Sequence, residues 1–309
     1  MNRILLTYLC ALVMTGCGTT TIGSSAGPGQ ITVVATTTQM QDLVHNVGGS
    51  HVHVVGILEP NVDPHDFSPT PQDAVALAGA DLVVESGAGV DAWAQELISD
   101  AGVDAPTFVA AAGLPLREGD SAEPDGDPHW WHDPTLFERA ATALAAGLAG
   151  VDPKHGADYR ANAERYVGEL RRMDARNRRL IACVPTAERK LVTNHDAFGY
   201  FAAHYGLTVV GSVIPSLSTA AQPSAQQVAA LIERIQQEHV RAIFTESSIN
   251  PQLEQQIGRE AGVRVYANLY GDTLGPSGSP GATYIGMERS NVQNVVTGLL
   301  GHAPNAGRC

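Results

Sequence analysis

Histidine and aspartate occur in four short segments whose composition suits metal binding. His65 lies in EPNVDPHDFSPTP, His195 lies in TNHDAFGYF, Asp272 lies in LYGDTLG, and the fourth segment, DPHWWHDP, holds two histidines three residues apart. Three neutral imidazoles and one carboxylate would give a divalent transition metal four donors and lower its charge from +2 to +1. With every position filled by protein, such a site stores a metal and does not activate water.

The segment DPHWWHDP leaves a choice between His129 and His132. His65, His132 and His195 are each followed directly by aspartate, and this local pattern favours His132 as the fourth donor. Those aspartates also precede predicted helices, so N-capping explains them without any metal. Spacing alone therefore does not decide between the two histidines.

The elements around these segments predict an α/β protein made of two halves. In the first half we expect strands at ITVVATTT, HVHVVGIL, DLVVESG and PTFVAAA, and in the second half at KLVTN, LTVVGSV, RAIFTE and VRVYANL. Helical stretches separate the strands, which predicts one four-stranded parallel sheet in each half. Ligands bind beyond the carboxyl ends of such strands. His65, His195 and Asp272 each follow a strand, so we expect the four segments to converge on one cleft.

A long helix is predicted between the two halves, starting at Asp152-Pro153. Its apolar positions step by four and three over about 28 residues, or roughly 42 Å, and they are Tyr159, Ala163, Tyr166, Leu170, Met173, Asn177 and Leu180. We therefore expect an N-terminal α/β domain over 31–152, a linker helix over 153–182 and a C-terminal α/β domain over 183–309.

The N-terminus has the pattern of a secretory signal. Residues 1–16 (MNRILLTYLCALVMTG) are too short to span a membrane. The sequence Met-Thr-Gly-Cys resembles a bacterial lipobox, which would make Cys17 a lipid anchor and 17–30 a flexible tether; the alternative is an ordinary signal with an incidental cysteine. No other segment is apolar for long enough to span a bilayer, so we expect the rest to be soluble. Whether Cys183 pairs with Cys309 stays open.

Charge and the remaining histidines limit the alternatives. A formal net charge of −13 argues against nucleic-acid binding and is compatible with attracting cations. Most of the 11 histidines are expected to be ordinary surface or core residues. The acidic segment from Arg117 to Asp127 is expected to be a solvated connection, whereas Trp130 and Trp131 are expected to line the cleft.

Several motifs together resemble the metal-binding family of ABC-transporter solute-binding lipoproteins, which capture zinc or manganese. They are VDPHDFSPTP, DPHWW, TNHDAFGYF, FTESSINP, LYGDTLG and GATYIGM, in that order after the lipobox. The resemblance implies two α/β domains joined by one rigid helix, with the metal buried in the cleft between them. It also implies the metal ligands, which fall here on His65, His129, His195 and Asp272.

The resemblance assigns roles to two further residues. His132 occupies a place where the family usually has leucine, so we expect it to contact a ligand residue, to lie beside the helix N-terminus, or to be an alternate ligand. Glu246 is expected to support the site by hydrogen bonds without touching the metal, and it is the alternate ligand if Asp272 lies far from the histidines. Manganese-binding members often have glutamate at the position of His195, so the resemblance favours zinc. Zinc-specific members commonly carry a histidine-rich loop before the second ligand, and this chain has an acidic one, so manganese remains a candidate.

We therefore expect a receptor and not an enzyme. It would be a lipid-anchored monomer on the extracytoplasmic face of the bacterial cell membrane, and it would pass Zn²⁺ (or Mn²⁺) to an integral-membrane ABC permease with its cytoplasmic ATPase. One alternative is a receptor for an iron chelate or another organic solute on the same fold. The other is a secreted metallohydrolase, which would need an open coordination position and a general base.

Overall fold

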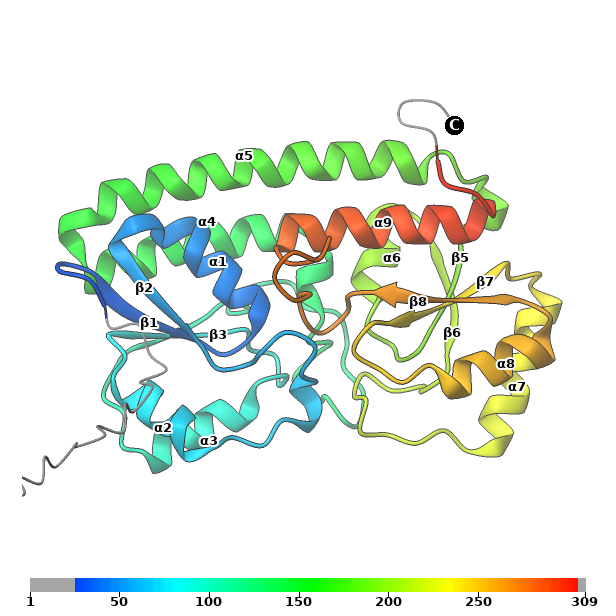
Figure 1. Ribbon diagram of the computed structural model, residues 1–309, viewed down its shortest axis with the longest axis horizontal. Helices are drawn as coiled ribbons and strands as arrows, with labels where there is room; N and C mark the ends of the chain where they lie inside the picture. The colour runs from blue at the N-terminus through cyan, green and yellow to red at the C-terminus, as the bar shows by residue number, and fades with distance from the viewer. Residues whose placement is uncertain (1–25, 305–309) are drawn as a thin grey trace, which may run out of the picture.

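Two lobes, each built on a four-stranded parallel sheet, make up the chain (Figure 1). The computed structural model describes residues 26–304. In the N-terminal lobe the strand order is β2-β1-β3-β4, from β1 (Ile31–Ala35), β2 (Val52–Gly56), β3 (Leu82–Glu85) and β4 (Thr107–Val109). In the C-terminal lobe it is β6-β5-β7-β8, from β5 (Lys190–Thr193), β6 (Thr208–Ser212), β7 (Ala242–Glu246) and β8 (Arg264–Leu269). The predicted fold class is confirmed.

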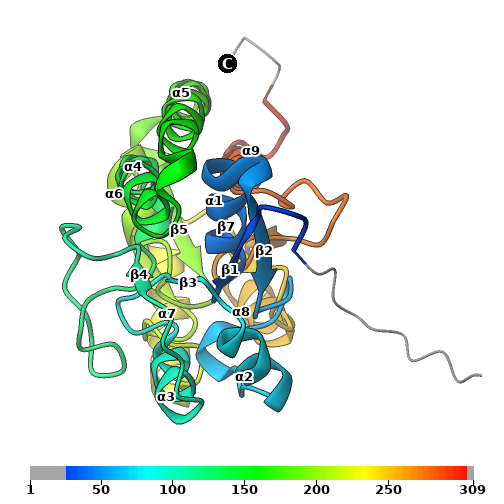
Figure 2. The same cartoon turned by 90° about the vertical axis from the view of Figure 1, so that its left-hand side faces the viewer.

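Helices cover both faces of each sheet (Figures 1 and 2). In the N-terminal lobe they are α1 (Thr38–Gly48), α2 (Pro71–Ala78), α3 (Ala92–Asp100) and α4 (Pro134–Val151). In the C-terminal lobe they are α6 (Gly199–Tyr205), α7 (Ala225–Gln237), α8 (Gln252–Ala261) and α9 (Tyr284–Leu300). Because both sheet faces are covered, the central strand Leu82–Glu85 is buried at every residue, and all but the terminal Glu85 are apolar.

The long helix α5 (Gly156–Ile181) runs along the side of both lobes (Figure 1). It has 26 residues and is shorter than predicted because Pro153–His155 form a separate 3₁₀ turn. Its predicted apolar stripe is buried as far as Asn177, after which Ile181 takes the buried position and Leu180 is only half-buried. Within residues 26–304 no helix carries an apolar stretch that could cross a bilayer.

Helix N-termini follow the capping rules in part. Asp133 caps α4 by accepting a hydrogen bond from Thr135 N at 2.8 Å, with Pro134 in the first turn, as predicted. The prediction that the aspartates after His65 and His195 also cap helices is wrong. The residue at the N-cap of α2 is Thr70, and α6 starts only at Gly199.

The segment after β8 leaves its own sheet and packs against the N-terminal lobe. We call residues 270–283 the return segment. Leu274 N donates to Thr38 Oγ1 of α1 at 2.8 Å, and Asp272 O accepts from Gln39 Nε2 at 2.9 Å. The first turn of α9 continues this packing, because Tyr284 stacks on Phe137 of α4 with ring centroids 3.6 Å apart. The C-terminal part of the chain therefore helps to build the core of the N-terminal lobe.

Candidate metal centre

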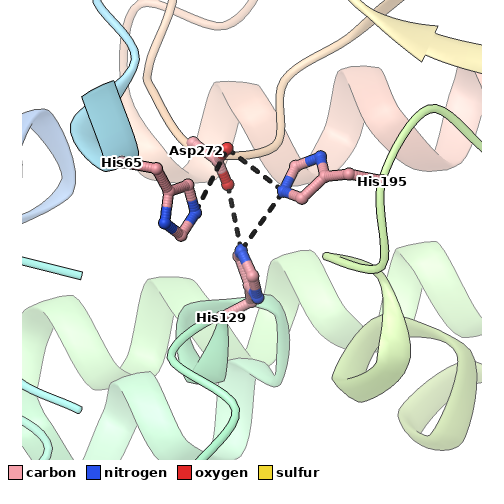
Figure 3. A group of neighbouring side chains, drawn as sticks. All are labelled: His65, His129, His195 and Asp272. Atoms are coloured by element: carbon pink, nitrogen blue, oxygen red, sulfur yellow. Dashed lines mark hydrogen bonds and ion pairs between the residues drawn. The ribbon is translucent and has the colours of Figure 1, made fainter. Parts of the chain in front are cut away.

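The structure brings four of the predicted site residues together between the lobes (Figure 3). His65 lies in the 3₁₀ turn Pro64–Asp66 after β2, and His129 lies just before the turn Trp130–His132. His195 follows β5, and Asp272 lies in the return segment after β8. One donor atom from each residue lies within 4.8 Å of the others. The topology therefore places donors from both lobes around a single point.

Each imidazole turns its Nε2 atom towards the Asp272 carboxylate (Figure 3). The distances to the nearest carboxylate oxygen are 3.2 Å from His195, 3.3 Å from His129 and 3.8 Å from His65. The side chains of His129 and His195 are fully buried, and that of Asp272 is 3% exposed. Buried polar atoms normally have hydrogen-bond partners, yet His65 Nε2 has none, and Asp272 Oδ1 has only the 3.3 Å contact with His129 Nε2. Four convergent donors with unsatisfied atoms suit a divalent cation.

A carboxylate from outside the group lies next to the Nδ1 atom of each histidine. The distances from Nδ1 are 3.2 Å to Glu123 for His65, 2.9 Å to Asp127 for His129 and 2.8 Å to Glu246 for His195. An ionised carboxylate only accepts hydrogen bonds, so each one favours the tautomer with the proton on Nδ1 and the lone pair on Nε2. The three outer carboxylates thus prepare all three imidazoles to bind a metal through Nε2.

The electrostatics of the centre favour a positive charge. Burial lowers the pKa of His129, but hydrogen bonds to Asp127 and Asp272 and the charges of both carboxylates raise that pKa to about 9. Burial also opposes protonation of His195, and the charges of Asp272 and Glu246 hold its pKa well above the ordinary value. Burial alone would raise the pKa of Asp272, but the two histidines hold it well below its ordinary value. Protons and metal therefore compete for the same atoms.

The sequence Asp-Pro-His occurs twice at this site and builds the same local geometry each time. Asp63 Oδ1 accepts from His65 N at 2.9 Å, and Asp127 Oδ1 accepts from His129 N at 3.0 Å. This repeat is visible in the printed sequence and singles out His129, which the His-Asp pattern alone did not.

His132 lies outside the group of four. Its Nδ1 is 3.1 Å from Glu288 Oε1 of α9, and its ring stacks on Phe198 with centroids 4.7 Å apart. Both members of the His132–Glu288 pair are fully buried. His132 therefore ties the turn that follows His129 to the C-terminal helix α9.

Glu246 and Trp131 connect the site to its surroundings. One oxygen of Glu246 lies beside His195, and the other accepts from Asp272 N at 3.1 Å, so Glu246 links two members of the group. Trp131 donates from Nε1 to Gly271 O at 3.0 Å and presents its ring to His129 with centroids 5.5 Å apart. Trp130 is buried and stacks on Phe137 of α4.

The roles of Glu123 and Asp127 are not evident from the sequence. The segment 117–127 is predicted to be a solvated connection, and for these two residues the prediction is wrong, since Glu123 is 8% exposed and Asp127 is 3% exposed. Asp127 also lies 3.5 Å from Arg117, and its carbonyl accepts from Tyr200 OH at 3.0 Å. Cys17 lies outside the described residues, as does Cys309, so the lipidation site and the Cys183–Cys309 question stay as predicted from sequence.

Known proteins resemble this chain in sequence and in fold. The family model of the periplasmic zinc-uptake complex component A (ZnuA) matches residues 33–298. The chain is 32% identical to the manganese-binding lipoprotein MntA of Bacillus subtilis, over 93% of this chain and 95% of that protein. It is also 32% identical to the zinc-binding protein TroA of Treponema pallidum, over 89% and 91%. A solved structure of TroA superposes with a TM-score of 0.82 at 30% identity, covering 88% of this chain and 99% of TroA. The chain therefore belongs to the ZnuA family, the metal-binding solute-binding proteins of ABC transporters that its motifs resemble.

Proposed function

We propose that this protein captures Zn²⁺ outside the cytoplasm and delivers it to an ABC permease for import. The observation that carries the proposal is the convergence of three buried Nε2 atoms on one buried carboxylate, with an outer carboxylate beside each imidazole. In this proposal His65, His129, His195 and Asp272 bind the metal. Glu246 supports His195 and Asp272, and His132 supports the turn after His129.

The donor set favours zinc over manganese. Three nitrogen donors and one oxygen suit Zn²⁺, and the Irving–Williams order ranks Zn²⁺ above Mn²⁺ at such a site. Manganese is the second candidate, because MntA, a relative at 32% identity, is named as manganese-binding. The acidic and histidine-free segment 117–127 also leaves manganese open.

Binding without catalysis follows from the same donor set. Four protein donors around one metal leave no open position for an activated water, which a hydrolase would require. The partners we propose are the integral-membrane permease and its cytoplasmic ATPase. We further propose a monomer held to the membrane by a lipid on Cys17 after removal of residues 1–16. A tether over 17–30 would then precede the domains over 31–152 and 183–309, which the 153–182 helix joins.

The test is a zinc titration of the soluble chain starting at Gly18, alongside His129→Ala and His132→Ala. We expect one tightly bound zinc in the parent, a large loss of affinity in His129→Ala and parent-like affinity in folded His132→Ala. Competition with Mn²⁺ in the same cell ranks the two metals. A parent chain that binds neither metal refutes the proposal, and a loss of affinity confined to His132→Ala refutes the ligand assignment.

A further inference from the structure

A short piece of the C-terminal lobe contacts the N-terminal lobe beside the metal centre. Residues Ser216–Thr219, which we call the latch segment, lie between β6 and α7. Leu217 N and Ser216 Oγ donate to Asp120 Oδ2 at 2.9 and 3.2 Å. Thr219 Oγ1 donates to Asp63 Oδ2 at 2.6 Å. The latch segment thus binds two carboxylates of the other lobe, one on each of two separate loops.

Asp63 uses its other oxygen to hold the backbone of His65. Its Oδ1 accepts from His65 N at 2.9 Å and so caps the 3₁₀ turn that carries the imidazole. One carboxylate therefore connects Thr219 of the C-terminal lobe directly to the backbone of His65.

Asp120 makes an equivalent connection to the side chain of His65. Its Oδ1 accepts from Ala122 N at 2.8 Å and from Glu123 N at 2.9 Å, which folds the turn that presents Glu123. Glu123 Oε1 then lies 3.2 Å from His65 Nδ1. Burial alone would raise the pKa of Asp120, but these hydrogen bonds and those from the latch segment lower it, so the ionised carboxylate is stable in this role.

His65 is the member of the group most dependent on such support. Its Nε2 lies 3.8 Å from Asp272, whereas the other two imidazoles lie at 3.2 and 3.3 Å. Its backbone is held by Asp63, which the opposite lobe binds. Its Nδ1 lies beside Glu123, whose turn is held by Asp120, and the opposite lobe binds Asp120 as well. His129 is positioned by Asp127, two residues before it in the chain, and the C-terminal lobe holds Asp127 through its backbone carbonyl, which accepts from Tyr200 OH at 3.0 Å.

We propose that Asp63 and Asp120 are positioning residues that couple the contact between the lobes to the orientation of His65, so that release of the latch segment frees His65 first and sets the rate of metal release. This inference rests on the proposed function, because it requires His65 to bind the metal. In this proposal the acidic segment 117–127 helps to position His65, and none of its residues touches the metal.

The test measures zinc dissociation from the loaded protein by rapid mixing with excess chelator. Thr219→Val removes one hydroxyl donor to a carboxylate, and Asp120→Asn removes the charge that holds both the latch segment and the Glu123 turn. Each change weakens a hydrogen bond to a charged group, so we expect dissociation about tenfold faster, which corresponds to about 1.4 kcal/mol. The matched controls, Thr208→Val on β6 and Asp125→Asn in the same acidic segment, are exposed and are expected to release zinc at the parent rate.

A double-mutant cycle separates positioning from general weakening of the site. In a His65→Ala background, Thr219→Val is expected to have no further effect on zinc release, because the residue through which it acts is missing. Further acceleration in that background overturns the proposal, as does parent-like release from both Thr219→Val and Asp120→Asn. A parent chain that binds zinc keeps the proposed function intact whatever the variants do, so the two failures are distinguishable.

Discussion

Replacing His132 by leucine should destabilise the protein strongly without weakening its metal site. His132 and Glu288 form a fully buried pair at 3.1 Å, and the second oxygen of Glu288 has no hydrogen-bond partner. Leucine fills a similar volume against Phe198 and keeps the contact apolar. The main effect of His132→Leu is therefore the loss of Glu288's only buried side-chain partner among the described residues.

The size of the destabilisation depends on whether the Glu288 carboxyl stays charged or takes up a proton once His132 is removed. Removing one partner of a buried ion pair costs about 3–5 kcal/mol. Burial already raises the pKa of Glu288, with His132 opposing that rise, so the lone carboxyl can take up a proton instead of staying charged. We therefore expect His132→Leu to lower the free energy of unfolding by about 3 kcal/mol, which lowers the thermal midpoint by roughly 6–12 °C in a protein of this size. Replacing both partners, as in His132→Leu with Glu288→Met, should restore most of the loss.

The assay is thermal and denaturant unfolding of the metal-free chain, with zinc affinity measured on the same samples at a temperature where every variant is folded. His302→Leu is the control, because His302 is exposed. A midpoint for His132→Leu equal to that of the control would refute the reasoning about the buried pair. A double variant no more stable than His132→Leu alone would show that packing, and not the lone carboxyl, causes the loss.

Three other predictions concern the charges around the site and the lobes. Zinc binding should release protons into a weakly buffered solution at neutral pH, because neighbouring carboxylates raise the pKa of His129 to about 9 in the metal-free site. A pH electrode measures the released protons, and zinc binding without proton release would contradict the prediction. Glu246→Gln should lower zinc affinity roughly 10–100-fold in the same titration, because Glu246 lies 2.8 Å from His195 Nδ1, whereas Glu233→Gln on α7 should leave it unchanged. Burial lowers the pKa of His204, but Asp133 and Asp174 raise it to about 9, above the unfolded value of about 6.5. The stabilisation that protonated His204 contributes is thus complete below about pH 6.5 and is lost as the pH rises through about 9. Between these pH values the thermal midpoint should therefore fall more in the parent than in His204→Gln. Equal slopes of thermal midpoint against pH in the two proteins would contradict this prediction.

The positions of the strands and of three site residues could be predicted because they depend on local pattern. His65, His195 and Asp272 follow apolar runs bounded by turn residues, and the parallel topology places the ends of such runs at one edge of a sheet. His129 depended on the family resemblance, although the repeated Asp-Pro-His sequence carried the same information.

Of the outer carboxylates, Glu246 was expected from the family resemblance, but Glu123 could not be predicted in the same way, because it depends on a contact between distant parts of the chain. Glu123 is 58 residues from His65, and it lies in a segment whose composition is that of an exposed loop. Asp120 accepts hydrogen bonds from Ala122 N and Glu123 N and so folds the turn that presents Glu123 to His65. The composition of the segment does not show which of its acidic side chains will be held in this way. The pairing of His132 with Glu288 spans 156 residues and is equally invisible to local pattern.

The return segment sets the order in which the centre can be assembled during synthesis. It joins α1 through hydrogen bonds that span 233 and 236 residues, and Tyr284 N adds one to Asp42 that spans 242. Ribosomes make the chain from the N-terminus, so all three histidines of the centre are made before Asp272 leaves the ribosome. Such long-range contacts also form late in folding. A nascent or truncated chain that ends before residue 272 thus lacks the carboxylate of the centre, and the four candidate donors come together only after the return segment has been made.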